Sequence, residues 1–98
     1  MIPSHNIIIS GNQWFWDQDG DELYGMYLLS QMNHCFVLSS NDVIHGFFVN
    51  SLKTSIDVLP GILNYMDLYF NYSGFYFINC RELCGVNHSS MPLYFVVK

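Results

Sequence analysis

Residues 80–92 read Cys-Arg-Glu-Leu-Cys-Gly-Val-Asn-His-Ser-Ser-Met-Pro. This stretch places two thiols (Cys80 and Cys84), one imidazole (His88) and one thioether (Met91) on a single loop, at spacings of four, four and three residues. Thiolate and thioether sulfur are soft ligands, which select copper, zinc or iron–sulfur rather than calcium or magnesium. Structural zinc sites use Cys and His, whereas a weak thioether beside thiolate and imidazole is typical of copper electron-transfer sites. The loop therefore predicts a copper site.

The ligand types available to this loop bear on how many copper ions it holds. A mononuclear blue-copper centre takes one Cys, two His and an axial Met, whereas this loop has two Cys and one His. Two thiolates that bridge two copper ions, with one terminal His on each, would use every ligand if a second His came from elsewhere. His45 is the upstream candidate, inside the apolar and β-branched run 43–49, which indicates a buried strand. A lone His there is usually a hydrogen-bonded core residue, but the loop downstream favours a ligand.

At these residues the chain resembles the copper-A domain of cytochrome c oxidase subunit II. The family's loop reads Cys-x-Glu-x-Cys-Gly-x-x-His-x-x-Met-Pro, and residues 80–92 match it without a gap. Residues 42–49 match the family's Asp-Val-x-His-x-Phe/Trp-x-Val segment, and residues 57–61 resemble its Asp-Ala-Ile-Pro-Gly stretch. Residues 13–16 resemble its aromatic box, Gln-Trp-Tyr-Trp. The resemblance covers residues 7–97.

The resemblance implies an all-β, cupredoxin-like Greek-key sandwich or barrel, with a dinuclear copper loop at one end. It implies that the thiolates of Cys80 and Cys84 bridge the two copper ions, and that His45 and His88 are the terminal ligands. Met91 would be one weak axial ligand, and the main-chain carbonyl of Glu82 would be the other. It also implies that the Glu82 side chain reaches a magnesium ion at the boundary with subunit I.

Two tryptophans, Trp14 and Trp16, lie within the aromatic box. We expect one of them to point to the core and the other to the surface. The resemblance makes Trp14 the residue through which electrons arrive from a donor protein; the alternative is that both are core residues. An exposed Trp would suit an interface, since aromatic side chains concentrate binding energy there.

Four acids follow the aromatic box within six residues: Asp17, Asp19, Asp21 and Glu22. A charge run is usually only a solvated turn. Here it dominates a chain that has 3 Lys and Arg against 8 Asp and Glu. We predict that it steers a basic donor such as cytochrome c. The same acidic balance argues against nucleic acid as a partner, since that binding needs Lys and Arg.

The composition indicates one domain, residues 1–98, that hides much of its surface against partners. Apolar residues make up 51% and charged residues 11%, and a soluble domain usually carries about 25% charged residues. No apolar run reaches the roughly 18 residues that span a bilayer, and no signal peptide is expected. The family's membrane hairpin would then lie on a separate chain or have been removed. Cys35 is left over by the copper assignment and is expected to be a buried structural thiol.

Short apolar runs separated by turn residues predict strands, and no helical period is present, which favours an all-β sandwich or barrel. Pro60 and Gly61 predict a turn, and residues 71–74 predict a hairpin-like turn between the strands on either side. The strands are expected near residues 7–9, 14–16, 23–29, 33–38, 43–49, 66–70, 74–78 and 93–97.

The resemblance implies an electron-transfer subunit of cytochrome c oxidase that passes electrons from cytochrome c to the haem-bearing subunit I. Other expected partners are further oxidase subunits and a separately encoded membrane hairpin. The expected location is the mitochondrial inner membrane, facing the intermembrane space. No nucleophile–base pair is visible, so the domain alone is not expected to be an enzyme. The alternatives are a nitrous oxide reductase-like protein and a structural or copper-delivery domain. Ile62 and Arg81 depart from the family's usual Arg and Ser.

Overall fold

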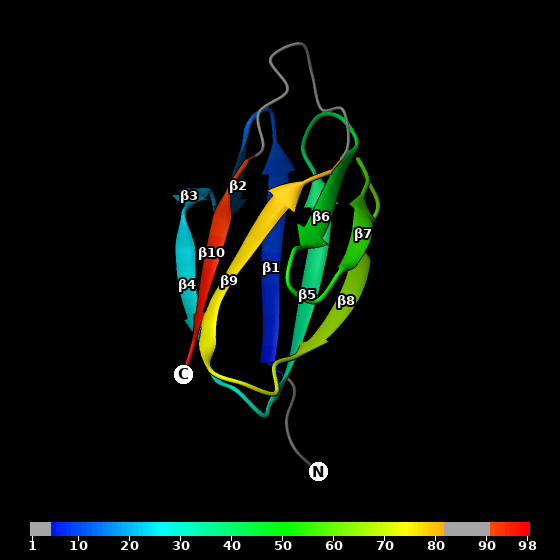
Figure 1. The fold of residues 1–98 in the computed structure, drawn as a ribbon. Helices are drawn as coiled ribbons and strands as arrows, with labels where there is room; N and C mark the ends of the chain where they lie inside the picture. Colours follow the sequence, from blue (N-terminus) through cyan, green and yellow to red (C-terminus); the bar gives the residue numbers. More distant parts are fainter. Residues whose placement is uncertain (1–4, 82–90) are drawn as a thin grey trace.

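The fold is known from a computed structural model that describes residues 5–81 and 91–98 (Figure 1). Strands and turns make up these residues, and none of them belongs to a helix that could cross a membrane. The strands within the described part of the chain are β1 (His5–Asn12), β2 (Phe15–Gln18), β3 (Asp21–Leu23), β4 (Gly25–Leu28), β5 (Asn33–Ser40), β6 (His45–Val49), β7 (Thr54–Val58), β8 (Asn64–Tyr69), β9 (Gly74–Cys80) and β10 (Leu93–Val97).

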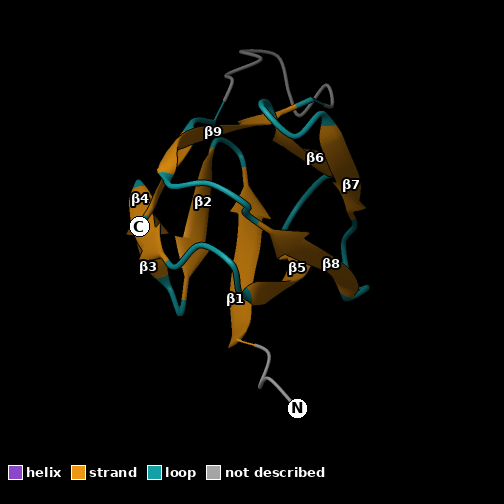
Figure 2. Cartoon of the chain, turned by 60° about the horizontal axis from the view of Figure 1, so that its bottom comes forward, coloured by secondary structure: helices purple, strands orange, loops and turns teal. Residues whose placement is uncertain are grey.

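The strands form two five-stranded sheets that face each other (Figure 2). Sheet A has the order β3-β2-β1-β5-β8, and sheet B has the order β4-β10-β9-β6-β7. Strand β1 runs parallel to β5, and β4 runs parallel to β10, whereas the other neighbours are antiparallel. The predicted all-β sandwich is therefore confirmed.

Alternation along the strands explains why two sheets pack. In β5, every second residue from His34 to Ser40 is buried and the residues between them are partly exposed. In β1, Ile7 and Ile9 are buried while Ile8 is 56% exposed. Successive side chains of a strand point to opposite faces of its sheet, so the buried residues of each sheet face the other sheet, and these two inward faces enclose the core.

The core is rich in aromatic rings, and Phe95 of β10 lies among three of them. Its ring stacks on Phe36 of the opposite sheet, with ring centroids 5.3 Å apart. It also lies 6.2 Å from Phe70 in an edge-to-face arrangement and 6.4 Å from Phe47. Aromatic pairs at such distances stabilise beyond the area that they bury. Phe95 therefore ties sheet B to sheet A.

Two sequence expectations about the strands are wrong. Residues 23–29 form no single strand, because β3 ends at Leu23 in sheet A and β4 begins at Gly25 in sheet B. Residues 71–74 form no hairpin turn, since β8 pairs with β5 in sheet A and β9 pairs with β10 and β6 in sheet B. In both places the chain crosses between the sheets, and such a crossing leaves no mark in the local alternation of apolar residues.

Candidate metal centre

Three of the predicted ligands lie within the described residues, namely His45, Cys80 and Met91. His45 and Cys80 come from neighbouring strands of sheet B. His45 is the first residue of β6 and Cys80 is the last residue of β9. These strands are antiparallel, with Phe47 opposite Cys80, so the start of one and the end of the other meet at the same end of the sheet. The backbone N–H of Arg81 donates to the carbonyl of Gly46 at 3.2 Å, which continues the pairing past Cys80.

His45 and Cys80 face each other at that end. Nδ1 of His45 lies 3.8 Å from Sγ of Cys80, His45 is fully buried, and Cys80 is 6% exposed. With bonds of about 2.0 Å to nitrogen and 2.3 Å to sulfur, as zinc sites show, two ligands of one ion lie roughly 3.5–4 Å apart. The separation of these two atoms fits a shared metal ion.

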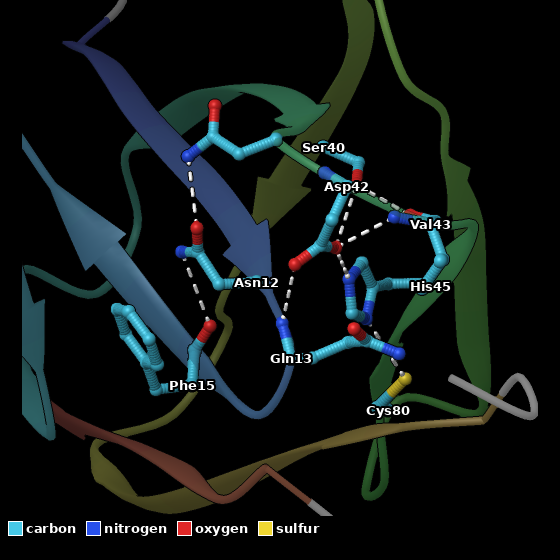
Figure 3. Close-up of polar contacts among 9 residues, drawn as sticks. Asn12, Gln13, Phe15, Ser40, Asp42, Val43, His45 and Cys80 are labelled. Carbon is cyan, nitrogen blue, oxygen red and sulfur yellow. Dashed lines mark hydrogen bonds and ion pairs between the residues drawn. The ribbon is translucent and has the colours of Figure 1, made fainter. Parts of the chain in front are cut away.

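The second ring nitrogen of His45 is held by Asp42 (Figure 3). His45 Nε2–H donates to Oδ1 of Asp42 at 2.9 Å. The carboxylate also accepts the backbone N–H of Gln13 at 2.7 Å and that of Val43 at 2.6 Å. Metal-binding His residues commonly donate their other ring N–H to a carboxylate, which fixes the tautomer and the ring orientation. His45 is thus fixed with Nδ1 directed toward Cys80.

His45 and Asp42 both have shifted pKa values. Burial acts to lower the pKa of His45, but hydrogen bonds with Cys80 and Asp42 outweigh burial and raise the pKa above its ordinary value. Burial acts to raise the pKa of Asp42, but hydrogen bonds from His45, Gln13 and Val43 outweigh burial and lower the pKa. The Asp42 carboxylate is therefore ionised at neutral pH, as an acceptor for His45 must be.

Gly11 of β1 makes room for the His45 ring. A Cβ atom at this position would lie 3.0 Å from Cδ2 of His45 and 3.1 Å from Cζ3 of Trp16. Contacts this short do not occur without displacement, and both rings are buried. The bare backbone of Gly11 therefore allows the two rings to pack at a centroid separation of 6.0 Å.

We expect Gly11→Ala to displace the His45 ring and to weaken copper binding by about tenfold, the lower end of the losses seen when outer-shell partners of a ligand are changed. Isothermal titration with copper measures the affinity, and the ring resonances of His45 in the metal-free chain report the displacement. Gly74→Ala is the matched control, because its new Cβ would make only an ordinary contact at 3.7 Å. Equal affinities in the two variants would contradict the close contact.

Trp16 connects the aromatic box to Met91. Its indole Nε1–H donates to the carbonyl of Met91 at 2.6 Å, and both residues are 1% exposed. Met91 has a positive φ of 49°, a conformation that few residues other than glycine adopt. The hydrogen bond from Trp16 and the burial of the Met91 side chain both hold this conformation.

We expect Trp16→Phe to lower the free energy of unfolding by about 1–3 kcal/mol, because the buried carbonyl of Met91 loses its indole donor. Denaturant titration of the metal-free chain measures this loss. Trp14→Phe is the control, since Trp14 is 39% exposed, and it should change stability by less than about 0.5 kcal/mol. If both variants were equally stable, the indole hydrogen bond to Met91 would contribute nothing to the free energy of unfolding.

As expected, one of the two tryptophans is exposed and the other buried: Trp14 is 39% exposed and Trp16 is 1% exposed. Residues two apart on one strand share a face. Trp14 lies in the turn before β2, whereas Trp16 lies within β2 and packs edge-to-face on Phe47 at 5.3 Å. The turn is therefore the reason that one ring is exposed and the other buried.

The four acids lie on the β2–β3 hairpin at the edge of sheet A. Asp17 is directly opposite Glu22, and the turn between the strands has positive φ at Asp19 and Gly20. Like charges directly opposite each other destabilise a strand pair. The pKa of Tyr24 is raised above its ordinary value, first by a hydrogen bond with Glu22, then by the negative charge of Glu22, and least by burial.

The remaining predicted ligands, Glu82, Cys84 and His88, lie outside the described residues. Pro60 and Gly61 form the expected turn, with a φ of 73° at Gly61. Sequence reasoning did not assign a role to Gly11. It included Asp42 only as the first residue of the matched segment 42–49, and the position of that acid three residues before a candidate ligand was the available signal.

Comparisons with known proteins bear on the family of this chain. Residues 21–98 match the family model described as cytochrome C oxidase subunit II, periplasmic domain. The chain is 42% identical over 73 residues to cytochrome c oxidase subunit 2 of Trichophyton rubrum, a match that covers 74% of this chain and 31% of that protein. The chain therefore spans about a third of the length of this curated relative.

Solved structures show the same fold. The periplasmic domain of subunit II of cytochrome oxidase of Bradyrhizobium japonicum superposes with a TM-score of 0.82 and 25% identity, covering 100% of this chain and 88% of that one. A rusticyanin variant superposes with a TM-score of 0.71 and 10% identity, covering 97% and 78%, which supports the cupredoxin-like fold alone. The family match and this fold lead to one conclusion: the chain belongs to the family of the cytochrome c oxidase subunit II periplasmic domain.

Proposed function

We propose that this chain is the electron-accepting domain of cytochrome c oxidase and holds a dinuclear copper-A centre. The observation that carries the proposal is the buried pair of His45 Nδ1 and Cys80 Sγ, 3.8 Å apart at one end of sheet B. The bound centre would supply a one-electron couple shared between two copper ions. The residues that would hold it are His45, Cys80, Glu82, Cys84, His88 and Met91.

The chain's own residues keep this site rigid. Asp42 holds the His45 ring in one orientation, and neighbouring strands fix the spacing of His45 and Cys80. Both side chains are buried, so water is kept from the described part of the site. A site that moves little between two redox states loses little energy to rearrangement, which suits electron transfer.

Hydrogen bonds link the backbone next to Trp14 with His45. Trp14 follows Gln13, whose backbone N–H donates to Asp42, and Asp42 accepts from His45 (Figure 3). This route supports Trp14 as the residue that receives electrons from cytochrome c. The acids on the β2–β3 hairpin follow Trp14 closely in the chain, so one surface could serve both docking and electron transfer.

The further partners are proposals of the same kind. They are subunit I, which would share a magnesium ion with Glu82, other oxidase subunits, and a membrane hairpin encoded separately. The proposed location is the mitochondrial inner membrane, with the domain facing the intermembrane space, in keeping with the eukaryotic relative. The family match does not favour a nitrous oxide reductase-like protein or a copper-delivery domain.

Donor docking and electron transfer can be tested separately by stopped-flow reduction with cytochrome c across a salt series. Neutralising Asp17, Asp19, Asp21 and Glu22 should slow reduction most at low salt, because exposed charges act mainly on encounter rate. The loss should shrink toward physiological salt, where the Debye length is about 8 Å. Trp14→Phe should slow reduction at every salt concentration and leave the copper spectrum unchanged.

Asp67→Asn is the matched control for the acids, since Asp67 is exposed on β8 of the same sheet, across the sheet from the hairpin. Its variant should keep the parent rate. If Trp14→Phe accepted electrons at the parent rate, Trp14 would not be the accepting residue. If the acid variants and Asp67→Asn behaved alike, the hairpin would have no part in docking.

A further inference from the structure

The outer side of sheet B is covered by aromatic rings. Along β10, Leu93, Phe95 and Val97 are buried, so the residues between them point outward. The same alternation points Phe75, Phe77 and Asn79 of β9 away from the core. We define the aromatic face as Tyr27, Phe48, Phe75, Phe77, Tyr94 and Val96.

Three rings of this face lie against one another, and Tyr27 lies close to them. The ring centroids of Phe75, Phe77 and Tyr94 are mutually 5.1–5.7 Å apart across two strands. Tyr27 is 73% exposed, Phe75 60% and Phe77 49%, and Val96 lies between Tyr27 and Phe75 in the strand register. Large contiguous apolar patches are rare on monomers, and Tyr, Phe and Arg are enriched at protein interfaces.

Two cations lie on rings of this face. The guanidinium of Arg81 sits 4.4 Å from the centroid of the Phe48 ring, and the ammonium of Lys98 sits 4.8 Å from that of Tyr27. Arg81 follows β9 and Lys98 follows β10, and these strands are antiparallel, so the cations mark opposite ends of the face. They are two of the 3 Lys and Arg residues in a chain of net charge −5.

The outward positions on the four strands that carry the aromatic face are free of acids within the described residues. They hold glycine, Asn79 and the residues of the face itself. Asp57 is exposed on the remaining strand, the edge strand β7. The acidic hairpin belongs to the other sheet. The aromatic face and the acidic hairpin therefore present opposite charge and different chemistry to the surroundings.

We propose that the aromatic face binds another protein chain through an apolar surface that carries a carboxylate near each end, one to meet Arg81 and one to meet Lys98. Buried aromatic anchors with charges at the rim are what a stable protein interface requires. The inference rests on the proposed function in one respect, namely that the partner is a constant member of an oxidase assembly.

Two other occupants fit the charges less well. In a two-fold pairing of two copies through this face, Arg81 would meet either Arg81 or Lys98 of its partner, and both contacts repel. An anionic lipid surface would attract the two cations but repel a chain of net charge −5. A partner with carboxylates near the two ends of the face avoids both problems.

The test uses the assembly purified with this chain from its own source. A benzophenone amino acid replaces Phe75, and in a control chain it replaces Tyr65, which is 62% exposed on sheet A. After irradiation, mass spectrometry should find the benzophenone at position 75 joined to another protein, through an apolar peptide that contains Asp or Glu. A link to a second copy of this chain, a link to lipid, or no link would overturn the proposal.

Hydroxyl-radical labelling of the unaltered assembly gives a second measurement that needs no substitution. Tyr27, Phe75 and Phe77 should be labelled about tenfold more slowly than Tyr72, which is 79% exposed, because an interface excludes solvent from its core. Labelling in proportion to exposure would overturn the proposal.

The charge requirement is tested by Lys98→Glu, which should lower the Phe75 cross-link yield about tenfold, while Lys98→Arg should keep the yield. Equal yields in both variants would overturn the role of the cation. Haem absorbance of the purified assembly separates this inference from the proposed function. A cross-link at position 75 in an assembly without haem would support the interface and contradict the proposed oxidase function. Haem without a cross-link would support the oxidase function and contradict the interface.

Discussion

Cys80→Ser is expected to abolish the dinuclear copper centre, the largest functional effect that the account predicts. One bridging thiolate would be gone, and a serine hydroxyl is a hard ligand that suits neither Cu(I) nor a delocalised copper pair. The EPR spectrum of the copper-loaded variant should lose the hyperfine pattern of one electron shared by two copper nuclei, and electron acceptance should stop.

Cys35→Ser is the matched control for that variant. Cys35 is not the buried thiol expected from the sequence: it is half-buried on β5 opposite Asp67, on the outward side of sheet A. Burial, then the neighbouring carboxylate, raise the pKa of its thiol. Its replacement should leave the copper spectrum unchanged. A shared-electron spectrum that survived in Cys80→Ser would show that Cys80 is not a bridging ligand.

Phe95→Ala is expected to have the largest effect on stability, a loss of about 3–5 kcal/mol in the free energy of unfolding. The Phe95 ring is fully buried and packs on Phe36, Phe47 and Phe70 from both sheets. Its removal leaves a cavity that strands on both sides cannot close. Because most domains are stable by only about 5–15 kcal/mol, this loss would be a large share of the chain's stability.

Denaturant unfolding of the metal-free chain measures this loss, with Phe75→Ala as the control. Phe75 is 60% exposed on the aromatic face, so the same truncation should cost less than about 1 kcal/mol in the free chain. A loss at Phe95 no greater than the loss at Phe75 would contradict the account of the core.

The sequence predicted the strands whose apolar residues alternate or cluster. Ile7 to Ile9, His34 to Leu38 and Leu93 to Val97 all lie in strands, since their β-branched and aromatic residues match a half-buried sheet. It missed β7, because the run Thr-Ser-Ile-Asp-Val of this edge strand is half polar. It also missed the crossings between sheets, because which strand pairs with which is decided by contacts distant in the chain.

For the site, ligand types could be read from the sequence but their supporting residues could not. Cys80 was predicted from residue type and spacing, and His45 as the upstream second imidazole within the matched segment 42–49; the structure places them face to face. The space left by Gly11 and the hydrogen bond from Trp16 to Met91 depend on how β1, β2 and β6 pack. No pattern within one strand records such contacts between sheets.

Copper stoichiometry combined with EPR of the parent chain tests the central claim most directly. The account predicts two copper ions per chain and, in the oxidised state, one unpaired electron shared equally by two copper nuclei. One copper ion per chain with the hyperfine pattern of a single nucleus, or zinc in place of copper, would contradict it.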